Sequence, residues 1–207
     1  MGGQIRTEGK VFPLAATPED YRQRFGSPEQ AKAAILEQWA EAARAPDGGG
    51  INTTLMASRP FPYPSSLPVL AAVKAAERQG GMLGHESYFN LAQEAHLTQC
   101  RNVADRHVLL DLAHDLALDL GDFEADLDSG ECDRAVLAEA EAARARDIQG
   151  TPTVLFDDRW ALPGAVPVEH YLAVVEDLLA GRDPRETAPT AKEAWTLRRP
   201  YRIVPPR

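Results

Sequence analysis

The chain has 207 residues, of which 44% are hydrophobic and 26% charged, and its formal net charge is −9. This composition is that of an ordinary globular protein with a sizeable core, and no apolar run reaches the roughly 20 residues of a membrane span. The acidic balance argues against a nucleic-acid partner, because phosphate binding needs a concentrated basic surface. Met1 is not followed by a basic segment and an apolar signal core, so we expect a cytoplasmic protein with no membrane partner.

The first part of the chain reads as a strand, a helix and a loop. Residues 4–14, "QIRTEGKVFPL", carry alternating apolar positions and end at a proline, which predicts a short strand. In "SPEQAKAAILEQWAEAARA", Ser27 is expected to cap a helix that ends in the "PDGGG" of residues 46–50. Residues 51–66 contain prolines at positions 60, 62 and 64, which predict an extended loop.

Helical signals dominate the middle of the chain. A helix capped by Ser65 or Ser66 is expected to stop at Gly80-Gly81, and a further helix should cover about 82–99. Asp105 is the expected cap of the next helix, in which apolar residues recur at helical spacing: Leu109, Leu112, Ala113 and Leu116. Another helix should occupy about 131–147.

The period of the pattern changes from 3.6 to 2 after that helix. "TPTVLFDD" and "RWALPGAV", separated by a tight polar turn, predict a β-hairpin, and "PVEHYLAVVEDLLAG" predicts a last amphipathic helix. The Pro- and Arg-rich residues 183–207 are expected to form an extended tail, with Trp195 and Tyr201 as anchors onto the body or a second subunit.

The order of strand, helices, hairpin and helix resembles a thioredoxin fold with the helical insertion of the DsbA family, and specifically its cytoplasmic FrnE-like branch. The resemblance covers roughly residues 8–180 and rests on these segments in the family's order: "VFPL", "RPFPYPSSLPVLAAVKAAERQG", "RNVADRHVLLDLA", "DLDSGECDRAV" and "GTPTVLFDDRWALPGAVPVEHYLAVVEDLL". It implies an α/β protein in which residues 1–26 and 148–182 form the thioredoxin-like part and 27–147 the helical insertion.

The family's activity is dithiol–disulfide exchange on protein or small-molecule thiols, and the resemblance assigns substrate binding to Gly150, Thr151 and Pro152. It implies a cis peptide bond between Thr151 and Pro152, a geometry that costs only about 0.5–1 kcal/mol before proline. The Thr151 backbone would then be free to accept an extended peptide as an added strand. From the residues alone, Pro152 could equally begin an edge strand, which proline tolerates.

The family's redox motif is absent, since the sequence contains no Cys-x-x-Cys. Because "VFPL" matches the segment after the family's second strand, the first strand and helix are expected to lie upstream of Met1. The resemblance therefore implies a DsbA-type oxidoreductase that should not catalyse the exchange efficiently in this chain, because the attacking thiolate is absent. The chain could be a truncated oxidoreductase, a shortened non-catalytic binding or oligomerisation module, or a protein with other thiol chemistry at Cys100 and Cys132. A fourth reading is a glutathione-dependent isomerase-like protein, which would use a serine at the nucleophile position.

The remaining candidate sites are less specific. Cys100 and Cys132 are candidate redox thiols, either unconnected or bridged, and we assign neither a catalytic role. Phe61 and Tyr63 could line a groove beside Pro152, or serve in core packing or loop anchoring. No cofactor is expected, and no metal site is predicted because the histidines lack close helical spacing: His85, His96, His107, His114 and His170. Loss of a central strand would expose backbone groups, so residues 4–14 could pair with the 153–157 strand, or a homodimer could close the gap.

Overall fold

The computed structural model describes residues 5–44 and 49–184, and these residues are mostly helical. They divide into two compact units, the first ending at Glu141 and the second beginning at Ala142. The sheet expected of a thioredoxin-like fold is represented in the described residues by two strands, β1 and β2. The chain is therefore more helical than an α/β reading of its sequence suggests.

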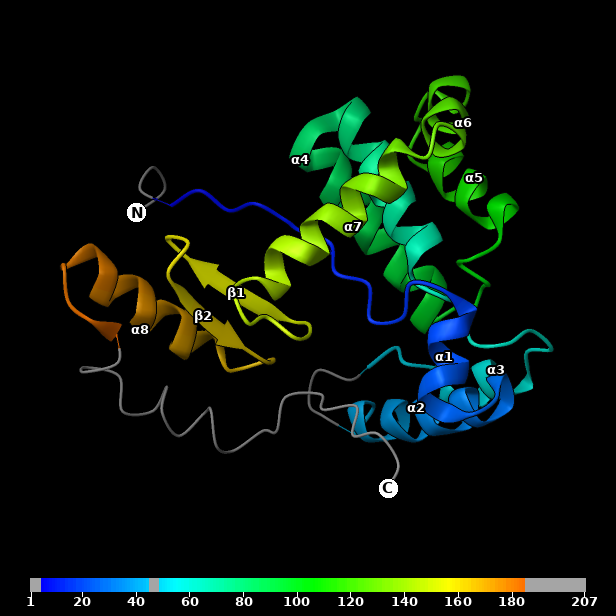
Figure 1. Ribbon diagram of the computed structural model, residues 1–207, viewed down its shortest axis with the longest axis horizontal. Coiled ribbons are helices and arrows are strands. Elements are labelled where there is room, and N and C mark those ends of the chain that lie inside the picture. Colours follow the sequence, from blue (N-terminus) through cyan, green and yellow to red (C-terminus); the bar gives the residue numbers. More distant parts are fainter. Residues whose placement is uncertain (1–4, 45–48, 185–207) are drawn as a thin grey trace. The chain divides into compact units, whose positions relative to one another are not determined.

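In its described part the first unit contains helices α1 to α6 and most of α7, whose last residues belong to the second unit, and Figure 1 shows α4 to α7 gathered into a bundle. They span α1 Pro18–Phe25, α2 Pro28–Ala42, α3 Thr53–Ser58, α4 Leu67–Leu97, α5 Arg106–Asp115, α6 Leu120–Asp128 and α7 Glu131–Arg144. Helices α1, α3 and α6 were not predicted. The segment 51–66 was expected to be a loop, but its prolines begin only at Pro60, so a short helix forms before them.

Local capping explains where several of these helices begin. The side chain of Ser27 accepts a hydrogen bond from the Gln30 backbone, and Asp105 caps α5 in the same way, as predicted. Asn52 caps α3 and Asp119 caps α6, while Thr17 forms a reciprocal capping box at the start of α1. Each cap satisfies a backbone donor that would otherwise have no partner in the first helical turn.

Helix α4 is interrupted at Gly81, whose backbone dihedrals of φ 59° and ψ −147° are not helical. The two predicted helices on either side of Gly80-Gly81 are therefore present, joined at a kink that only glycine adopts without strain. The second half folds back closely on the first, because a Cβ at Gly84 would lie 2.3 Å from the carbonyl oxygen of Ala76. This close approach requires glycine at position 84.

The main core of the first unit lies between α4, α5, α6 and α7. Its largest fully buried side chains include Tyr88 of α4, Leu112 of α5 and Phe123 of α6. The Tyr88 hydroxyl donates a hydrogen bond to the Leu109 carbonyl oxygen at 2.9 Å, so its polar end is satisfied inside the core. Val136 of α7 completes the packing from the last helix of the bundle.

The strand predicted at residues 4–14 is wrong, because the described residues 5–14 form no strand. A strand needs a neighbouring backbone to complete its ladder, but here side chains take the backbone donors. The Val11 N–H donates to Glu139 of α7, and the Gly9 N–H donates to the Met82 sulfur. Among the described residues the sheet consists of β1 and β2 only, so it does not include the proposed pairing of this segment with the 153–157 strand.

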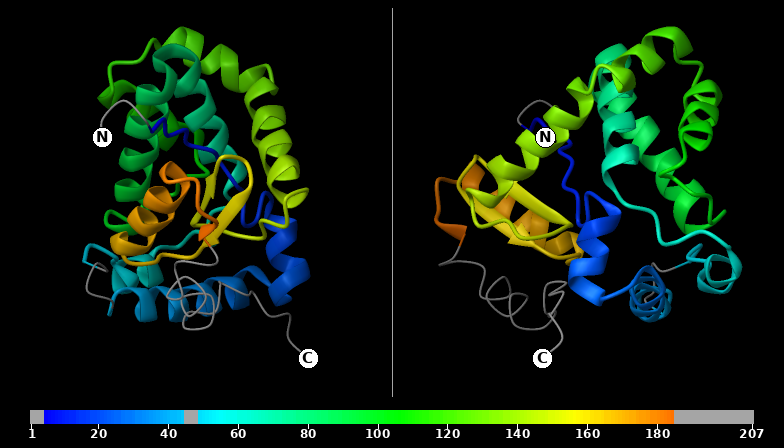
Figure 2. Two further views of the ribbon diagram at one scale, coloured as in Figure 1. Left: turned by 90° about the vertical axis from the view of Figure 1, so that its left-hand side faces the viewer. Right: turned by 45° about the vertical axis from the view of Figure 1, so that its right-hand side comes forward.

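The second unit is a hairpin followed by a helix, as predicted. Strands β1 Thr153–Phe156 and β2 Trp160–Pro163 are antiparallel, and helix α8 Val168–Leu179 lies beside them (Figures 1 and 2). The Tyr171 hydroxyl of α8 donates to the carbonyl oxygen of Gly164, which follows β2. The predicted tail, with Trp195 and Tyr201, lies mostly outside the described residues.

Two further findings concern the domain organisation and the possibility of a membrane-spanning helix. The grouping of residues 1–26 with 148–182 into one domain stays a prediction. The described residues of these two ranges belong to different compact units. Within the described ranges, none of the helices combines the length and apolar character needed to cross a bilayer.

Candidate functional site

The Thr151–Pro152 turn is the centre of the candidate site, and its peptide bond is cis, as the resemblance implied. Two hydrogen bonds hold the turn in the second unit. The Thr153 hydroxyl donates to the Gly150 carbonyl oxygen, and the Gly164 N–H donates to the Pro152 carbonyl oxygen, each at 2.8 Å. Thr151 and Pro152 themselves are exposed, so this fixed turn presents its backbone at the surface.

The register of the hairpin shows which backbone groups of β1 face away from β2. The Gly164 N–H bonds to the carbonyl oxygen of the opposing Pro152, and hydrogen-bonded pairs alternate with non-bonded pairs along an antiparallel ladder. Val154 and Leu162 are therefore a hydrogen-bonded pair, whereas the pairs on either side of them, at Thr153 and at Leu155, are not. The N–H and C=O groups of Thr153 and Leu155 therefore point to the other edge of β1. Among the described residues, nothing bonds to these outward groups or to the Thr151 backbone.

This edge is a short row of strand backbone groups that continues directly from the cis turn. An extended peptide can pair with such a row by adding itself as a further strand. Val154, partly exposed on the sheet face, could contact a side chain of the added strand. The arrangement can thus bind a polypeptide without any catalytic side chain.

The two cysteines are free and lie in separate apolar clusters of the first unit. Cys100 is fully buried beside Trp39 and Met56, and its thiol lies 3.2 Å from the Asn52 carbonyl oxygen. Cys132 is buried in the main core. Burial raises the pKa of both thiols, which disfavours the thiolate that attacks disulfides. The structure therefore does not bring the two candidate redox thiols together.

Phe61 and Tyr63 anchor the proline-rich loop to the core of the first unit. The Tyr63 ring packs edge-on against Trp39 at 5.9 Å between centroids, and its hydroxyl lies 3.0 Å from Nε2 of His96. Lys32 lies over the Phe61 ring and donates to the Phe61 carbonyl oxygen. These contacts support the loop-anchoring reading of the two aromatic residues, and their role as a groove beside Pro152 stays a prediction.

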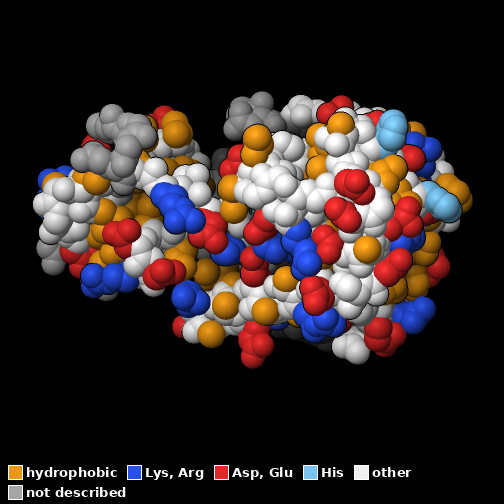
Figure 3. Space-filling view, turned by 90° about the horizontal axis from the view of Figure 1, so that it is seen from above, with side chains coloured by type: hydrophobic (Ala, Val, Ile, Leu, Met, Phe, Trp, Pro, Cys, Tyr) orange, Lys and Arg blue, Asp and Glu red, His pale blue; other side chains and the backbone are white. Residues whose placement is uncertain are grey.

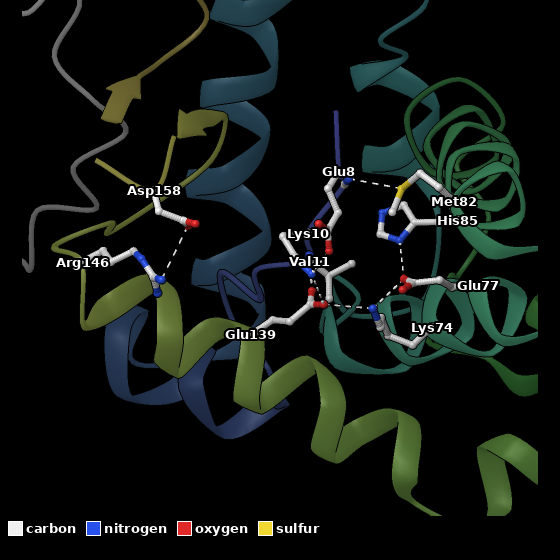
Figure 4. A network of polar contacts seen from close by, with 11 residues as sticks. Glu8, Lys10, Val11, Lys74, Glu77, Met82, His85, Glu139, Arg146 and Asp158 are labelled. Atoms are coloured by element: carbon white, nitrogen blue, oxygen red, sulfur yellow. Dashed lines mark hydrogen bonds and ion pairs between the residues drawn. The ribbon is translucent and has the colours of Figure 1, made fainter. Parts of the chain in front are cut away.

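A polar network in the first unit was missed by the sequence reading (Figure 4). Lys74 of α4 is nearly buried and donates to Glu77 at 2.5 Å and to Glu139 of α7 at 2.9 Å. His85, also buried, lies 2.8 Å from Glu77. The one signal available was a lysine inside the apolar run "LPVLAAVKAAE", with a glutamate three residues later.

This network connects the N-terminal segment to two helices. Glu139 also accepts the backbone N–H of Val11 at 2.8 Å, so one carboxylate joins α4, α7 and the segment near Val11. A Cβ at Gly9 would lie 2.8 Å from Nε2 of His85, which shows how closely the segment passes the network. Each of these charged groups lies beside an opposite charge, which is the arrangement that a buried ion pair needs to offset its loss of solvation.

The charged side chains on the face shown in Figure 3 are of both signs and interspersed, without a continuous basic area. Ion pairs join many charged side chains of the described residues: Arg106, for example, binds Glu124 and Asp128, and Arg78 binds Asp126 and Glu131. Within the part of the chain that the structure describes, no three His, Cys, Asp or Glu side chains form a metal-binding group.

A helical body followed by a cis-proline turn, a hairpin and a helix defines the class of thioredoxin-like proteins with a large helical part. The chain matches the DSBA-like thioredoxin domain family over residues 13–176 and belongs to it. It is 32% identical over 135 residues to the ClpXP adapter protein SpxH of Bacillus subtilis (strain 168), covering 61% of this chain and 45% of the relative.

A second relative is the ClpXP adapter protein SpxH of Shouchella clausii (strain KSM-K16), which is 31% identical over 135 residues, covering 62% of this chain and 43% of the relative. The chain thus spans less than half the length of these curated relatives.

Two solved structures resemble the fold. The cytosolic disulfide reductase DsbM from Pseudomonas aeruginosa has a TM-score of 0.55 at 23% identity, covering 86% of this chain and 80% of that chain. A putative protein disulfide isomerase from Nitrosomonas europaea has a TM-score of 0.62 at 20% identity, covering 80% of this chain and 89% of that chain. At these identities the likeness shows the fold alone.

Proposed function

We propose that this chain is a non-catalytic protein-binding module, which holds an extended segment of a partner protein along β1 at the Thr151–Pro152 turn. The observation that carries the proposal is the row of unpaired backbone groups at Thr151, Thr153 and Leu155. Backbone pairing supplies affinity for any extended peptide, and side-chain contacts beside it supply the selectivity.

The thiol chemistry of the chain supports a binding role over catalysis. Attack on a disulfide needs an accessible thiolate, but Cys100 and Cys132 are buried and burial raises the pKa of each. The sequence also contains no Cys-x-x-Cys. The relatives are named ClpXP adapter proteins, and an adapter binds one protein so that another can act on it, which supports the same role. We include in the proposal that the chain acts in this way in the cytosol.

Dithiol–disulfide exchange is the second candidate, with the glutathione-dependent isomerase reading as its variant. The observation in its favour is the match to the DSBA-like thioredoxin domain family over residues 13–176, since the resemblance gives dithiol–disulfide exchange as the family's activity. Reduction of insulin by this chain with glutathione as electron donor measures that activity directly. No turnover above the glutathione background is expected, and turnover that depends on the chain would overturn the non-catalytic proposal.

Peptide binding can be tested with a phage-displayed library of linear peptides, selected on the full chain. We expect the selected peptides to slow amide hydrogen exchange at Thr153 and Leu155, whose N–H groups face outward. Val154 and Phe156, whose groups already pair with β2, should change little. Peptides that protect all four strand amides equally, or none of them, would contradict strand addition at this edge.

A matched pair of proline variants provides a second test. Leu155→Pro removes an outward donor of β1, and Ala161→Pro removes the equivalent donor from the opposite edge of the hairpin. We expect Leu155→Pro to weaken binding of a selected peptide about tenfold, the loss of one hydrogen bond. Ala161→Pro should bind normally, and circular dichroism of both variants checks that the fold is retained.

A further inference from the structure

Helix α8 carries a second apolar face that is not used to pack on the hairpin. Val168, Leu172, Val175 and Leu179 follow one another at intervals of four, three and four residues, the spacing of a coiled-coil seam. Val168 is 63% exposed, Leu172 54% and Leu179 49%, while Val175 is partly exposed. We call these four residues the α8 seam.

The side of α8 that does pack is a different one. Val174 and Asp177 are buried, and the Tyr171 hydroxyl bonds to Gly164 beyond β2. At 100° per residue Val174 and Asp177 lie well over 90° from the centre of the α8 seam. The apolar character of the seam is therefore not accounted for by the packing of the hairpin.

The charges beside the α8 seam indicate what it binds. Glu169 and Glu176 are exposed, lie seven residues apart and form one flank of the seam. In coiled-coil packing such flanking positions meet the flank of the partner helix and select opposite charge. We propose that the α8 seam docks an amphipathic helix of another protein that carries apolar residues at seam spacing and Lys or Arg on its flank.

A second copy of this chain fits the α8 seam poorly. Antiparallel pairing of two α8 helices would place the acidic flanks of Glu169 and Glu176 against each other. Parallel pairing would set those glutamates against Tyr171 and Leu178, which carry no positive charge. The net charge of −9 adds repulsion between copies. A partner helix with Lys or Arg on its flank places positive charge beside Glu169 and Glu176 and avoids this repulsion.

The test uses the full chain and fluorescein-labelled peptides of about three heptads, with Leu at the seam positions and either Lys or Glu on the flanks. Fluorescence polarisation measures the affinity of each peptide, and a scrambled peptide of the Lys composition controls for attraction to the acidic surface. We expect the Lys-flanked peptide to bind about tenfold more tightly than the Glu-flanked and scrambled peptides.

Variants of the chain locate the binding surface. Leu172→Glu should weaken the Lys-flanked peptide about tenfold, whereas Leu137→Glu, at an exposed leucine of α7, should not. The double variant Glu169→Lys/Glu176→Lys should reverse the preference and bind the Glu-flanked peptide more tightly. Leu155→Pro, which impairs the β1 edge, should bind the helical peptides normally. Binding at the α8 seam is therefore measured independently of strand addition at β1, and one proposal can fail without the other.

Two outcomes would overturn the proposal. Equal binding of the Lys-flanked and Glu-flanked peptides, or equal weakening by Leu172→Glu and Leu137→Glu, would mean that the α8 seam does not recognise a basic helix. Sedimentation of the unliganded chain as a dimer that Leu172→Glu dissociates would mean that the seam pairs with a second copy instead.

Discussion

The carboxylate of Glu139 in α7 accepts the backbone N–H of Val11 at 2.8 Å, across 128 positions of the chain. The same side chain receives Lys74 at 2.9 Å, so it neutralises a nearly buried ammonium group while it holds the N-terminal segment. Removing it leaves Lys74 with Glu77 alone and leaves the Val11 donor without its partner.

We predict that Glu139→Ala lowers the free energy of unfolding by about 2 kcal/mol, since it breaks one side of a buried ion pair and a backbone hydrogen bond. Urea unfolding followed by circular dichroism measures the change. Glu141→Ala, an exposed glutamate close by in α7, serves as the control and should shift stability by less than about 0.5 kcal/mol. Equal effects of the two substitutions would contradict the structural role of Glu139.

A pair of glycine substitutions tests the fold of α4. The Cβ of Gly84→Ala would lie 2.3 Å from the Ala76 carbonyl oxygen, which forces backbone apart and should cost about 2 kcal/mol. Gly80→Ala meets no atom within 4 Å and should be neutral or stabilising by up to about 1 kcal/mol. Thermal unfolding of both variants gives the comparison, and a tolerated alanine at position 84 would show that the two halves of α4 pack less closely.

The stability of the first unit should depend on pH through His96. Burial beside Trp39 and Tyr63 lowers the pKa of His96 from 6.5 to about 4, so the folded protein holds the neutral ring. Between these values the unfolded chain binds the proton and the folded chain does not, so stability is full above pH 6.5 and is lost as the pH falls towards 4.

We expect the contribution of His96 to the free energy of unfolding to fall by about 2 kcal/mol when the pH is lowered from 7 to 5. Urea unfolding at both pH values measures the change in the free energy of unfolding. His96→Gln should show a smaller pH dependence, while His107→Gln, at an exposed position, should keep it unchanged. A pH dependence that survives in His96→Gln would assign the effect to another group.

The two thiols should be protected but not bonded. Because burial raises the pKa of Cys100 and Cys132, an aromatic disulfide reagent should react slowly with the native chain at pH 7. After denaturation without reductant, the same reagent should detect both thiols of each chain. Rapid reaction of the native protein would contradict the burial, and no reaction after denaturation would reveal a disulfide.

The parts of the fold that the sequence predicted correctly depend on short-range chemistry. The caps Ser27 and Asp105, the break at Gly80-Gly81 and the hairpin after Pro152 each follow from a few neighbouring residues. The cis peptide bond at Thr151–Pro152 came from the family resemblance, and the membership of the chain in the DSBA-like thioredoxin domain family supports it. The FrnE-like branch stays a prediction.

The predicted strand at 4–14 failed because alternation specifies a strand only where a neighbouring backbone completes it. Residues near Val11 find a carboxylate and a thioether instead, on helices more than 70 positions away. The polar network around Lys74 was missed for the same reason, namely that it is formed by residues far apart in the sequence. Its members come from both halves of α4, from α7 and from the N-terminal segment.

By itself, therefore, the sequence determined the helices α2, α4, α5, α7 and α8 and the hairpin, whose signals are local. The cis peptide bond at Thr151–Pro152 followed only from the family resemblance. Tertiary structure alone decided that Cys100 and Cys132 are buried in separate clusters, that Phe61 and Tyr63 contact the core of the first unit, and which groups of β1 face outward. Burial and pairing depend on residues brought together from distant parts of the chain, and that juxtaposition is settled by packing free energy rather than by neighbouring side chains.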